Sequence, residues 1–370
     1  MQKRLGIMGC GQLSQMLGEA ARRLGASVSF LCVDETPVVS GLGAIYGVDS
    51  SGADSIGIES VDAFFDQCDA ITVERESLPD ALLQRARDEV GLAPGYDALV
   101  VLRQRDTQKA MLDQLDIPTS PWGVATTAAE LAGVLSTLPS RYSRCKRILG
   151  GYDGGGQWRV NADTLDAIPA GGYPLIAEAE ITIERELAII IARDTLGHSV
   201  CYPITENVMR NGILIGSHVP ATVTPEHRQL AETYARRLVD AMGYVGVLAI
   251  EFFVTDGRLI VNEIAPRVHN TGHWTMGAVG ADQFIQHVRV VLGDPVTEPV
   301  FNQAAAMVNI LNAPLPARMP EGPIRMLMQT YGKGVRPGRK LGHLTLIGPD
   351  ADAVRREADQ YIAELHGTED

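Results

Sequence analysis

The sequence is short of cysteine, of positive charge and of long apolar runs. The five cysteines show no metal or redox spacing, and an odd, dispersed set is typical of reduced thiols in a cytosol. The net charge is 32 − 45 = −13, so nucleic acid and anionic membranes are poor general partners. No run approaches the ~18 apolar residues of a membrane-spanning helix, and the N-terminus has no signal-peptide pattern. We therefore expect a cytoplasmic protein that binds no membrane and no nucleic acid. The cysteines are Cys10, Cys32, Cys68, Cys145 and Cys201.

Length and composition are those of a globular protein with a sizeable core. A chain of 370 residues predicts two or three domains. Its 45% hydrophobic and 21% charged residues are ordinary for such a protein, and we find no internal repeat or low-complexity segment. An acidic protein that binds anionic substrates must concentrate its positive charge locally.

The N-terminal segment predicts a parallel sheet. Arg4–Gly9 predicts a short buried strand, a helix with an apolar face follows the glycine turn, and Ser27–Asp34 predicts a second strand. The turn Gly9–Gln12 places backbone N–H groups at a helix N-terminus, where they can bind an anion. A dehydrogenase would use this turn for a dinucleotide, but Ser14 stands where the third glycine of that fingerprint belongs.

Charged residues follow at the end of a later strand and at the start of a helix. Asp69–Pro79 predicts a strand end with Glu74 and Glu76 at alternate positions, hence on one face. Arg105–Lys109 begins a helix, and we place the first domain boundary near Arg103.

Two glutamates, Glu251 and Glu263, lie in apolar runs separated by Thr255-Asp256-Gly257, which predicts an antiparallel hairpin. A two-residue loop would send them to opposite faces. A three-residue loop puts them on one face, with Glu263 diagonal to Glu251, and we expect that register. Unpaired buried carboxylates are costly, and two on one face suit Mg²⁺ together with substrate phosphates. A glutamate in water beside one in a salt bridge is the alternative.

The segment Gly150–Trp158 contains five glycines in nine residues, which predicts a loop whose N–H groups can wrap phosphate oxygens. Lys146, just upstream, can supply a point charge for phosphate. The loop is neither a Walker loop nor a Rossmann fingerprint, and alone it could be a plain surface loop.

Two later segments complete the pattern. Thr224 and Pro225 begin a helix that Gly243 ends, and this helix is scaffold. The turn Lys333–Lys340 carries four cations in eight residues, which in an acidic protein favours a phosphate clamp over a solvated turn.

Taken in order, the motifs resemble a known family. They are the GGYDG loop, YPITENVMRNGIL, EFFV, NEIAPRVHNTGHW and RPGRKLGHL, spread over about Leu5 to Leu344. They resemble the 5-(carboxyamino)imidazole ribonucleotide synthetases, biotin-independent ATP-grasp carboxylases of purine biosynthesis. The resemblance implies an α/β and α+β chain with the ATP-grasp fold. A Rossmann-like parallel-sheet domain would span residues 1–103, an ATP-grasp domain 104–295 with a lid at about 118–174, and a small C-terminal domain 296–370.

The resemblance also implies a reaction and its residues. ATP would phosphorylate bicarbonate to carboxyphosphate, which carboxylates 5-aminoimidazole ribonucleotide, with Mg²⁺ or Mn²⁺ bound and the enzyme a homodimer. Glu251 and Glu263 would bind metal, and Arg267, His269 and Lys146 would act in catalysis, with His269 carrying protons because an unperturbed histidine has a pKa near ~6.5. The nucleotide would contact Arg105, Lys146, Gly151, Tyr152, Asp153, Gly154, Gly155, Gly156, Gln157, Glu178, Ala179, Glu180, Ile181, Glu186, Met209, Asn262 and Glu263. The ribonucleotide would contact Gln12, Glu74, Tyr152, Asp153, Lys333 and Arg339.

The chain departs from the family pattern at several positions. Gly155 stands where the family has Lys or Arg, Met209 where some members carry a nucleotide-contacting His, and Ser77 where it has Asn. Ser143 and Arg144 are poor residues for the buried strand expected before Lys146, so either the lid sheet is exposed there or the lid is destabilised. These changes bear on lid closure and substrate affinity more than on reaction type.

Three other functions fit parts of the sequence. Another ATP-grasp ligase, such as a formate-using ribonucleotide transformylase, would share the glutamate hairpin but not the whole RVHNTGHW and RPGRK pattern. A non-catalytic nucleotide sensor would keep ATP binding and lose turnover. An NAD-dependent dehydrogenase would require nicotinamide binding.

Overall fold

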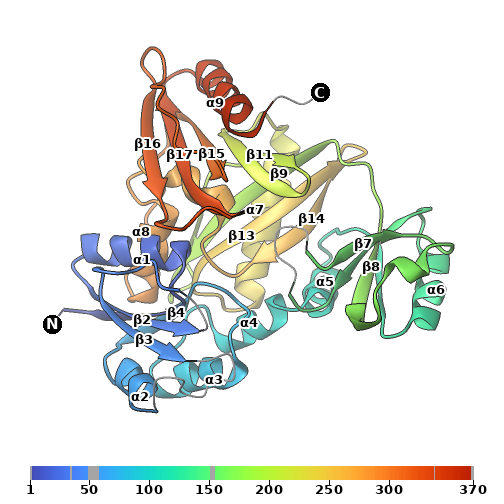
Figure 1. Ribbon diagram of the computed structural model, residues 1–370, viewed down its shortest axis with the longest axis horizontal. Helices are drawn as coiled ribbons and strands as arrows, with labels where there is room; N and C mark the ends of the chain where they lie inside the picture. Colours follow the sequence, from blue (N-terminus) through green and yellow to red (C-terminus); the bar gives the residue numbers. More distant parts are fainter. Residues whose placement is uncertain (1, 34–35, 49–57, 151–154, 337, 368–370) are drawn as a thin grey trace.

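The computed structural model describes residues 2–33, 36–48, 58–150, 155–336 and 338–367. Figure 1 shows three parts: an N-terminal parallel sheet, a long central sheet that the C-terminal strands extend, and a small sheet that stands apart from both. Within the described residues, none of the helices combines the length and apolar character needed to cross a membrane.

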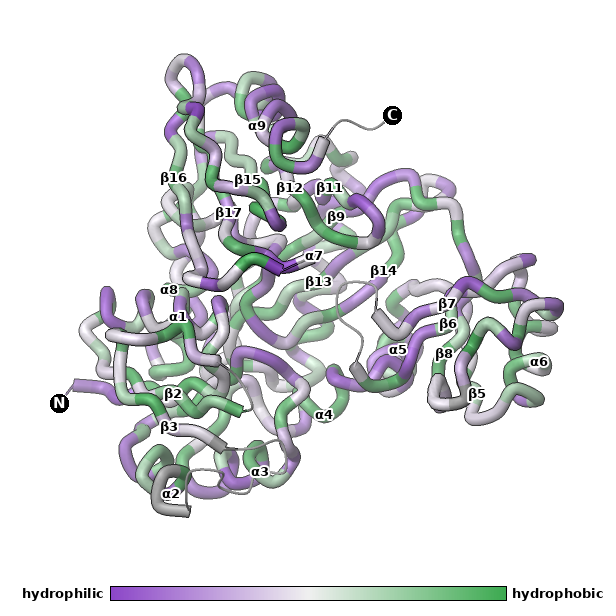
Figure 2. Tube along the Cα trace, viewed as in Figure 1, coloured by the Kyte–Doolittle hydropathy of each residue, from purple (hydrophilic) through white to green (hydrophobic). Residues whose placement is uncertain are grey.

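The N-terminal part is the predicted parallel sheet. Its strands pair in the order β3-β2-β1-β4, with β1 in the interior. β1 and β2 are almost wholly buried. The green colour of β2 in Figure 2 marks its residues as hydrophobic. The elements are β1 (Arg4–Met8), α1 (Gln12–Arg23), β2 (Ser27–Val33), β3 (Ala44–Val48), α2 (Ile58–Asp66), β4 (Ala70–Val73), α3 (Asp80–Glu89) and α4 (Tyr96–Leu102).

The cysteines differ from expectation at one pair. Adjacent parallel strands β1 and β2 bring Cys10 and Cys32 together with their Cα atoms 5.3 Å apart, and the two sulfurs are bonded. The prediction that all five thiols are reduced is therefore wrong for this pair. Cys68 and Cys145 are buried free thiols, and Cys201 is a half-buried one.

The central sheet is antiparallel and positions most of the site. Its strands follow the order β14-β13-β9-β11-β12-β15-β17-β16, and β10 pairs with β9. The strands are β9 (Arg185–Arg193), β10 (Ser199–Cys201), β11 (Thr205–Arg210), β12 (Ile213–Val219), β13 (Gly246–Thr255), β14 (Arg258–Ala265), β15 (Ala304–Leu311), β16 (Arg325–Thr330) and β17 (Lys340–Gly348). Residues after 296, expected as a C-terminal domain, therefore extend this same sheet.

Helices cover the central sheet. α7 (Pro225–Ala241) packs on β9 and β14, and it begins as predicted, with the Thr224 hydroxyl accepting from the backbone N–H of His227 at 3.1 Å. α8 (Gln283–Val291) lies between α1 and β13, so the apolar core runs from the N-terminal part into the central sheet. α9 (Ala351–His366) covers β15 and β17, and the 3-10 helix η3 (Asn270–Thr275) follows β14.

The lid is a small antiparallel sheet with its own apolar core. The strand order is β5-β8-β6-β7, and α5 (Arg105–Gln114) precedes it where predicted. Because β8 belongs to this sheet, the lid sheet continues to Ala179, beyond the expected boundary at about residue 174. The elements are β5 (Trp122–Ala125), α6 (Ala128–Thr137), β6 (Ser143–Arg147), β7 (Gln157–Val160), the 3-10 helices η1 (Leu165–Ala167) and η2 (Ala170–Gly172), and β8 (Leu175–Ala179).

Candidate active site

The two hairpin glutamates are direct cross-strand partners, but not by the register expected. Thr255 pairs with Arg258, so the loop has two residues, and Asp256 and Gly257 both adopt positive φ (49° and 68°) as a tight hairpin turn demands. The three-residue loop is therefore wrong. A β-bulge beside Phe252 takes up Asn262 as an extra residue, so that Glu251 pairs with Glu263 itself. The bulge, rather than the loop length, returns both carboxylates to one face.

A third carboxylate shares this face. On β9, Ala188 pairs with Glu251, and Glu186 is two residues away along the strand, on the same side. Burial, followed by the charges of Glu263 and Glu186, raises the pKa of Glu251 to about 8. This face therefore repels further negative charge and has a strong demand for a cation.

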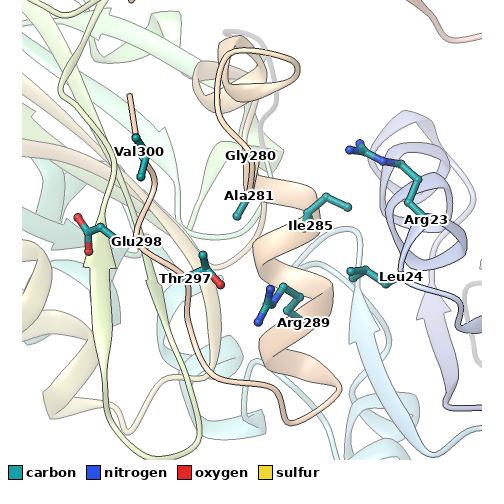
Figure 3. Close-up of a pocket in the computed structure, with 9 residues that line it drawn as sticks. All are labelled: Arg23, Leu24, Gly280, Ala281, Ile285, Arg289, Thr297, Glu298 and Val300. Atoms are coloured by element: carbon teal, nitrogen blue, oxygen red, sulfur yellow. The ribbon is translucent and has the colours of Figure 1, made fainter. Parts of the chain in front are cut away.

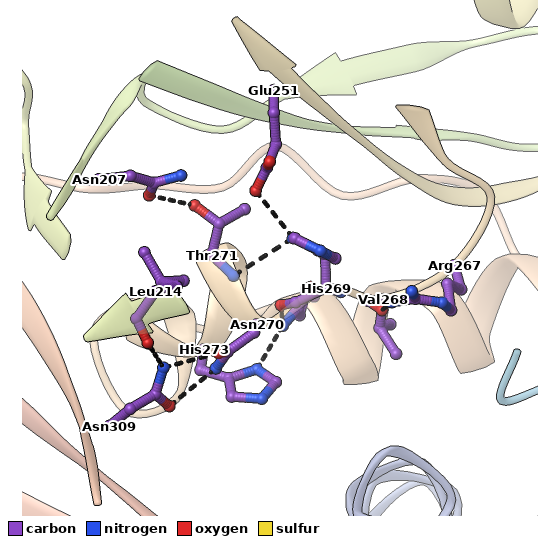
Figure 4. A network of polar contacts seen from close by, with 11 residues as sticks. Asn207, Leu214, Glu251, Arg267, Val268, His269, Asn270, Thr271, His273 and Asn309 are labelled. Carbon is purple, nitrogen blue, oxygen red and sulfur yellow. Dashed lines mark hydrogen bonds and ion pairs between the residues drawn. The ribbon is translucent and has the colours of Figure 1, made fainter. Parts of the chain in front are cut away.

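The loop after β14 is tied to three other parts of the chain (Figure 4). The buried guanidinium of Arg267 donates to the Glu76 carboxylate at 2.9 Å. Thr271 donates to Asn207 of β11 at 2.7 Å, and the amides of Asn270 and Asn309 exchange two hydrogen bonds of 3.0 and 2.7 Å. The loop is thus rigid where the sequence predicted catalytic residues.

His269 points its Nδ1 toward Glu251, at 3.8 Å from Oε1, and the same nitrogen accepts from the N–H of Thr271 at 3.4 Å. Burial, with the nearby cations Arg267 and Lys340, holds the pKa of His269 well below its usual value. The pKa near neutrality expected for His269 therefore does not hold in this environment, and its part in proton transfer stays a prediction. It is a neutral imidazole able to orient a ligand.

A buried group of two lysines and a glutamate organises the lid side. The Glu178 carboxylate contacts Lys109 with one oxygen and Lys146, at 2.5 Å, with the other. Burial would raise the pKa of Glu178, but Lys146 and Lys109 together lower it to about 2. Lys109 also donates to Thr119, whose hydroxyl donates to the carbonyl of Val261 at 2.8 Å. The lysine pair is thereby fixed to β14 one residue before its bulge.

Two main-chain N–H groups at the end of β8 and in the linker after it are already hydrogen-bonded within the lid. The N–H of Ala179 donates to Pro121 and that of Glu180 donates to Tyr142, at 2.8 and 3.1 Å, so these donors already serve the lid. Glu178 faces the two lysines, so each of its carboxylate oxygens already contacts a cation. Sequence cannot show which main-chain groups are already paired, and the assignment of Glu178, Ala179 and Glu180 to the nucleotide stays a prediction.

The polar strand before Lys146 is explained by its alternation. On β6, Ser143 and Cys145 are buried and Arg144 is exposed. The Glu180 carboxylate lies 3.6 Å from Arg144 and 2.8 Å from Arg159. The first of the two expected explanations therefore holds, since this lid sheet is exposed on one face.

The described part of the glycine loop contacts the end of β6 and the start of α5. Gly156 has a positive φ of 69°, and its carbonyl accepts from the N–H of Arg147 at 3.1 Å. The guanidinium of Arg105 donates to the carbonyls of Arg147 and Gly150 at 2.9 and 2.6 Å. Arg105 therefore holds the main chain at both ends of the segment 147–150, where the chain leaves β6. Gly155 is exposed and Gln157 is half-buried. The predicted contacts Gly151, Tyr152, Asp153 and Gly154 lie outside the described residues.

The N-terminal glycine turn binds a carboxylate of the protein itself. Buried Glu74 accepts from the N–H groups of Gly11 (2.6 Å) and Leu13 (3.1 Å) and from the Ser14 hydroxyl (2.9 Å). The expected open anion site at this helix N-terminus is thus filled from within. β4 ends at Val73, so the prediction that Glu74 and Glu76 share one strand face is also wrong. They leave the strand toward different partners.

The basic turn reaches the N-terminal domain. The ammonium of Lys333 contacts the side-chain oxygen of Gln12, which brings together two predicted ribonucleotide residues 321 positions apart. Arg339 is half-buried and donates to the carbonyl of Gly334 at 3.3 Å. Met209 is half-buried on β11, beside a second bulge.

Sequence reasoning missed several residues that the fold places at the site. Lys109 was treated only as part of a helix start, and a lysine there is usually solvated. The charge of Lys340 partly opposes the rise in the pKa of Glu251 and adds to the lowering of the pKa of His269, although only the turn as a whole was singled out. For Glu76 the sequence predicted a strand face but did not identify Arg267 as its partner. Spacing could not have paired any of them, because each meets its partner only through the tertiary fold, far away along the chain.

A separate cavity of about 450 Å³ lies between the end of α1, α8 and the segment 297–300 (Figure 3). Arg23 and Arg289 line it, with apolar neighbours such as Ile285 and Val300. None of its lining residues is among the predicted site residues, so this cavity is not the candidate active site.

Comparison with known families agrees with this architecture. Residues 1–103 match the ribonucleotide synthetase preATP-grasp domain, 110–284 the ATP-grasp domain, and 305–357 the phosphoribosylaminoimidazole carboxylase C-terminal domain. The predicted ATP-grasp fold, with an N-terminal parallel sheet, is confirmed.

Curated and solved relatives cover almost the whole chain. The N5-carboxyaminoimidazole ribonucleotide synthase of Escherichia coli is 33% identical over 367 residues, 98% of this chain and 95% of that protein. The crystal structure of the synthetase from Thermus thermophilus has a TM-score of 0.88 at 31% identity, covering 99% of both chains. The synthase from Aspergillus clavatus, solved with ADP and 5-aminoimidazole ribonucleotide, has a TM-score of 0.85 at 27% identity, covering 98% of both. The chain therefore belongs to the N5-carboxyaminoimidazole ribonucleotide synthase family, ATP-grasp enzymes of purine biosynthesis.

Proposed function

We propose that this chain uses ATP to carboxylate the amine of 5-aminoimidazole ribonucleotide with bicarbonate, giving N5-carboxyaminoimidazole ribonucleotide, ADP and phosphate. The observation that carries the site assignment is the direct pairing of Glu251 with Glu263 across the hairpin, next to His269. Family membership supplies the reaction, and this geometry supports the choice of residues.

The carboxylate face fits a divalent cation. Among the described residues, no group of three or more His, Cys, Asp or Glu side chains forms a metal site by itself. Two carboxylates with unrelieved repulsion suit Mg²⁺, which takes its remaining ligands from phosphate and water, and Mn²⁺ could replace it. Such an ion supplies positive charge at the β- and γ-phosphates of ATP. Glu251 and Glu263 would hold it.

The nucleotide would lie between the lid and the central sheet. Lys146, fixed by Glu178, would place its charge on phosphate, and the loop from Gly151 to Gln157 would cover it and exclude water. Arg105 holds the carbonyls at the base of that loop. We assign the ribose to Glu186 and the adenine edge to Ile181 and to carbonyl groups of the linker, with Met209 and Asn262 as neighbours.

The carboxylation steps would occur at the loop after β14. A bicarbonate oxygen attacks the γ-phosphorus, the bond to the β-phosphate oxygen breaks, and ADP and carboxyphosphate form. The carboxyphosphate C–O bond then breaks to give CO₂ and phosphate. The substrate amine attacks that carbon and passes its proton to the phosphate. Arg267, held by Glu76, and neutral His269 would orient these anions in a site that they pre-organise.

The ribonucleotide would bind where the basic turn meets the N-terminal domain. Lys333 and Arg339 would take its phosphate, and Gln12 already contacts Lys333. Glu74, Tyr152 and Asp153 would complete the pocket. We further propose a cytoplasmic homodimer, by analogy with the family.

The test is ADP formation by the purified chain with ATP, with and without bicarbonate and the ribonucleotide. We expect ADP and a carbamate product only when all three substrates are present. Formate-dependent product would instead indicate a transformylase. ATP binding without substrate-dependent ADP would indicate a nucleotide sensor.

A further inference from the structure

A buried amide side chain grips the peptide groups of His269. Gln283 is the first residue of α8 and is fully buried. Its Oε1 accepts from the backbone N–H of His269 at 2.9 Å, and its Nε2 donates to the carbonyl of the same residue at 2.8 Å. One side chain thus satisfies both main-chain groups of a predicted catalytic residue.

The orientation of this amide is determined by its partners. A backbone N–H can only donate, so the oxygen of Gln283 must face it and the nitrogen must face the carbonyl. The second hydrogen of Nε2 then points to Nδ1 of His273 at 3.0 Å, which must be an unprotonated acceptor. Burial holds the pKa of His273 well below its usual value, in agreement with this tautomer.

The contacts continue toward the basic turn. The rings of His273 and His343 lie 4.7 Å apart between centroids, and Nδ1 of His343 lies 2.7 Å from the hydroxyl of Tyr331. His343 and Tyr331 are both 1% exposed, and Tyr331 is two residues before Lys333. A continuous buried series of side chains therefore connects His269 with the base of the proposed phosphate clamp.

The residue beside the amide must be glycine. A Cβ on Gly272 would lie 2.5 Å from Oε1 and 2.8 Å from Cδ of Gln283, which is closer than atoms approach. Gly272 thus leaves the room that the amide needs. The next residues of the loop are held by Asn309 and Asn207 instead, as Figure 4 shows. The Gln283 amide therefore holds His269 in particular.

We propose that Gln283 is a positioning residue, which fixes the peptide groups of His269, sets its imidazole beside Glu251 and ties this loop to the base of the basic turn. This positioning role rests on the role proposed above for His269. Gln283 itself touches no reacting atom in this arrangement. It acts by holding a group that must be placed within a fraction of an ångström.

The experiment compares Gln283→Leu and Gly272→Ala with the wild type in steady-state ADP formation. The first variant removes the amide, and the second displaces it without changing it. We expect kcat to fall about 10- to 100-fold, the scale for a misplaced catalytic group, with KM for ATP within about threefold. Hydrogen exchange of the segment 269–271 should accelerate in both.

Gln286→Leu is the matched control. Gln286 lies one turn further along α8, is fully buried, and clamps Thr297 in the same way, accepting from its N–H at 3.2 Å and donating to its carbonyl at 2.6 Å. We expect a similar loss of thermal stability with kcat within about threefold of wild type, because stability alone does not set turnover. An equal fall of kcat in Gln286→Leu, or an unchanged kcat in Gln283→Leu, would overturn the positioning role.

The exchange measurement separates this inference from the proposed function. If the wild type forms no ADP in a substrate-dependent manner, the proposed function fails. The positioning role of Gln283 can still be tested in that case. Hydrogen exchange at 269–271 that is equally slow in wild type and Gln283→Leu would overturn it. Faster exchange in Gln283→Leu, but not in Gln286→Leu, would support it.

Discussion

Replacing Lys109 with Met tests whether the buried lysine pair organises the nucleotide side of the site. The ammonium contacts Glu178 and donates to Thr119 at 2.5 Å, and its side chain is only 4% exposed. Methionine keeps an unbranched apolar side chain, slightly shorter than that of lysine, and removes the charge and both contacts. Lys146 remains on the other carboxylate oxygen, so Glu178 is not left without a cation.

The magnitude follows from two opposing effects. Lowering the pKa of Glu178 from 4.5 to about 2 corresponds to about 3 kcal/mol of folding stability. Burial, however, lowers the pKa of Lys109, so keeping that ammonium charged in the interior costs part of this gain. With Lys146 still in place, we expect Lys109→Met to lower the free energy of unfolding by about 1–2 kcal/mol.

The pH dependence has a definite sign. Because the folded-state pKa of Glu178 is depressed, its contribution is complete above the unfolded value of 4.5 and is lost as pH falls toward about 2. In Lys109→Met one of the two charges that lower the pKa of Glu178 is gone. The variant therefore has less folding stability to lose as the pH falls. The gap between the variant and the wild type should therefore be widest above pH 4.5 and should narrow below it.

The assay is urea unfolding at several pH values, followed by fluorescence, together with KM for ATP. Two of the three tryptophans, Trp122 and Trp158, lie on lid strands, so the signal reports on the lid. We expect a raised KM for ATP, because Glu178, which holds Lys146, loses the second lysine that fixes its position. Lys3→Met, which removes an exposed pair with Asp294, is the control and should change stability by less than about 1 kcal/mol. Unchanged stability and unchanged KM in Lys109→Met would refute the reasoning.

Three further outcomes are expected. Glu263→Gln should abolish turnover with little change in stability, because Glu263 is exposed on the carboxylate face; near-normal turnover with the same Mg²⁺ dependence would contradict this. Lys333→Ala should raise KM for the ribonucleotide far more than KM for ATP, and equal changes would place the basic turn elsewhere. Gly11→Ala should raise KM for the ribonucleotide, because its Cβ would lie 2.4 Å from the Glu74 carboxylate, whereas Gly95→Ala, with nothing within 4 Å, should behave as wild type in the same titration.

Local patterns were sufficient for several elements of this fold. The parallel strands around α1, the capped helix after Thr224 and the two strands of the glutamate hairpin form where apolar periodicity and turn residues predicted them. The same patterns could not give the hairpin register. A bulge at Asn262 depends on pairing with β13, and no residue type announces it.

The sequence by itself determined which chemical groups are present, in which order, and on which secondary elements, because these depend on residue type and on contacts a few positions apart. Only the tertiary structure decided which groups meet. Lys109 with Glu178, Gln12 with Lys333, Arg267 with Glu76 and Gln283 with His269 are brought together by sheets and helices distant in the chain. It also decided their charge, because the burial that keeps His269 neutral and raises the pKa of Glu251 exists only after the chain has closed around them.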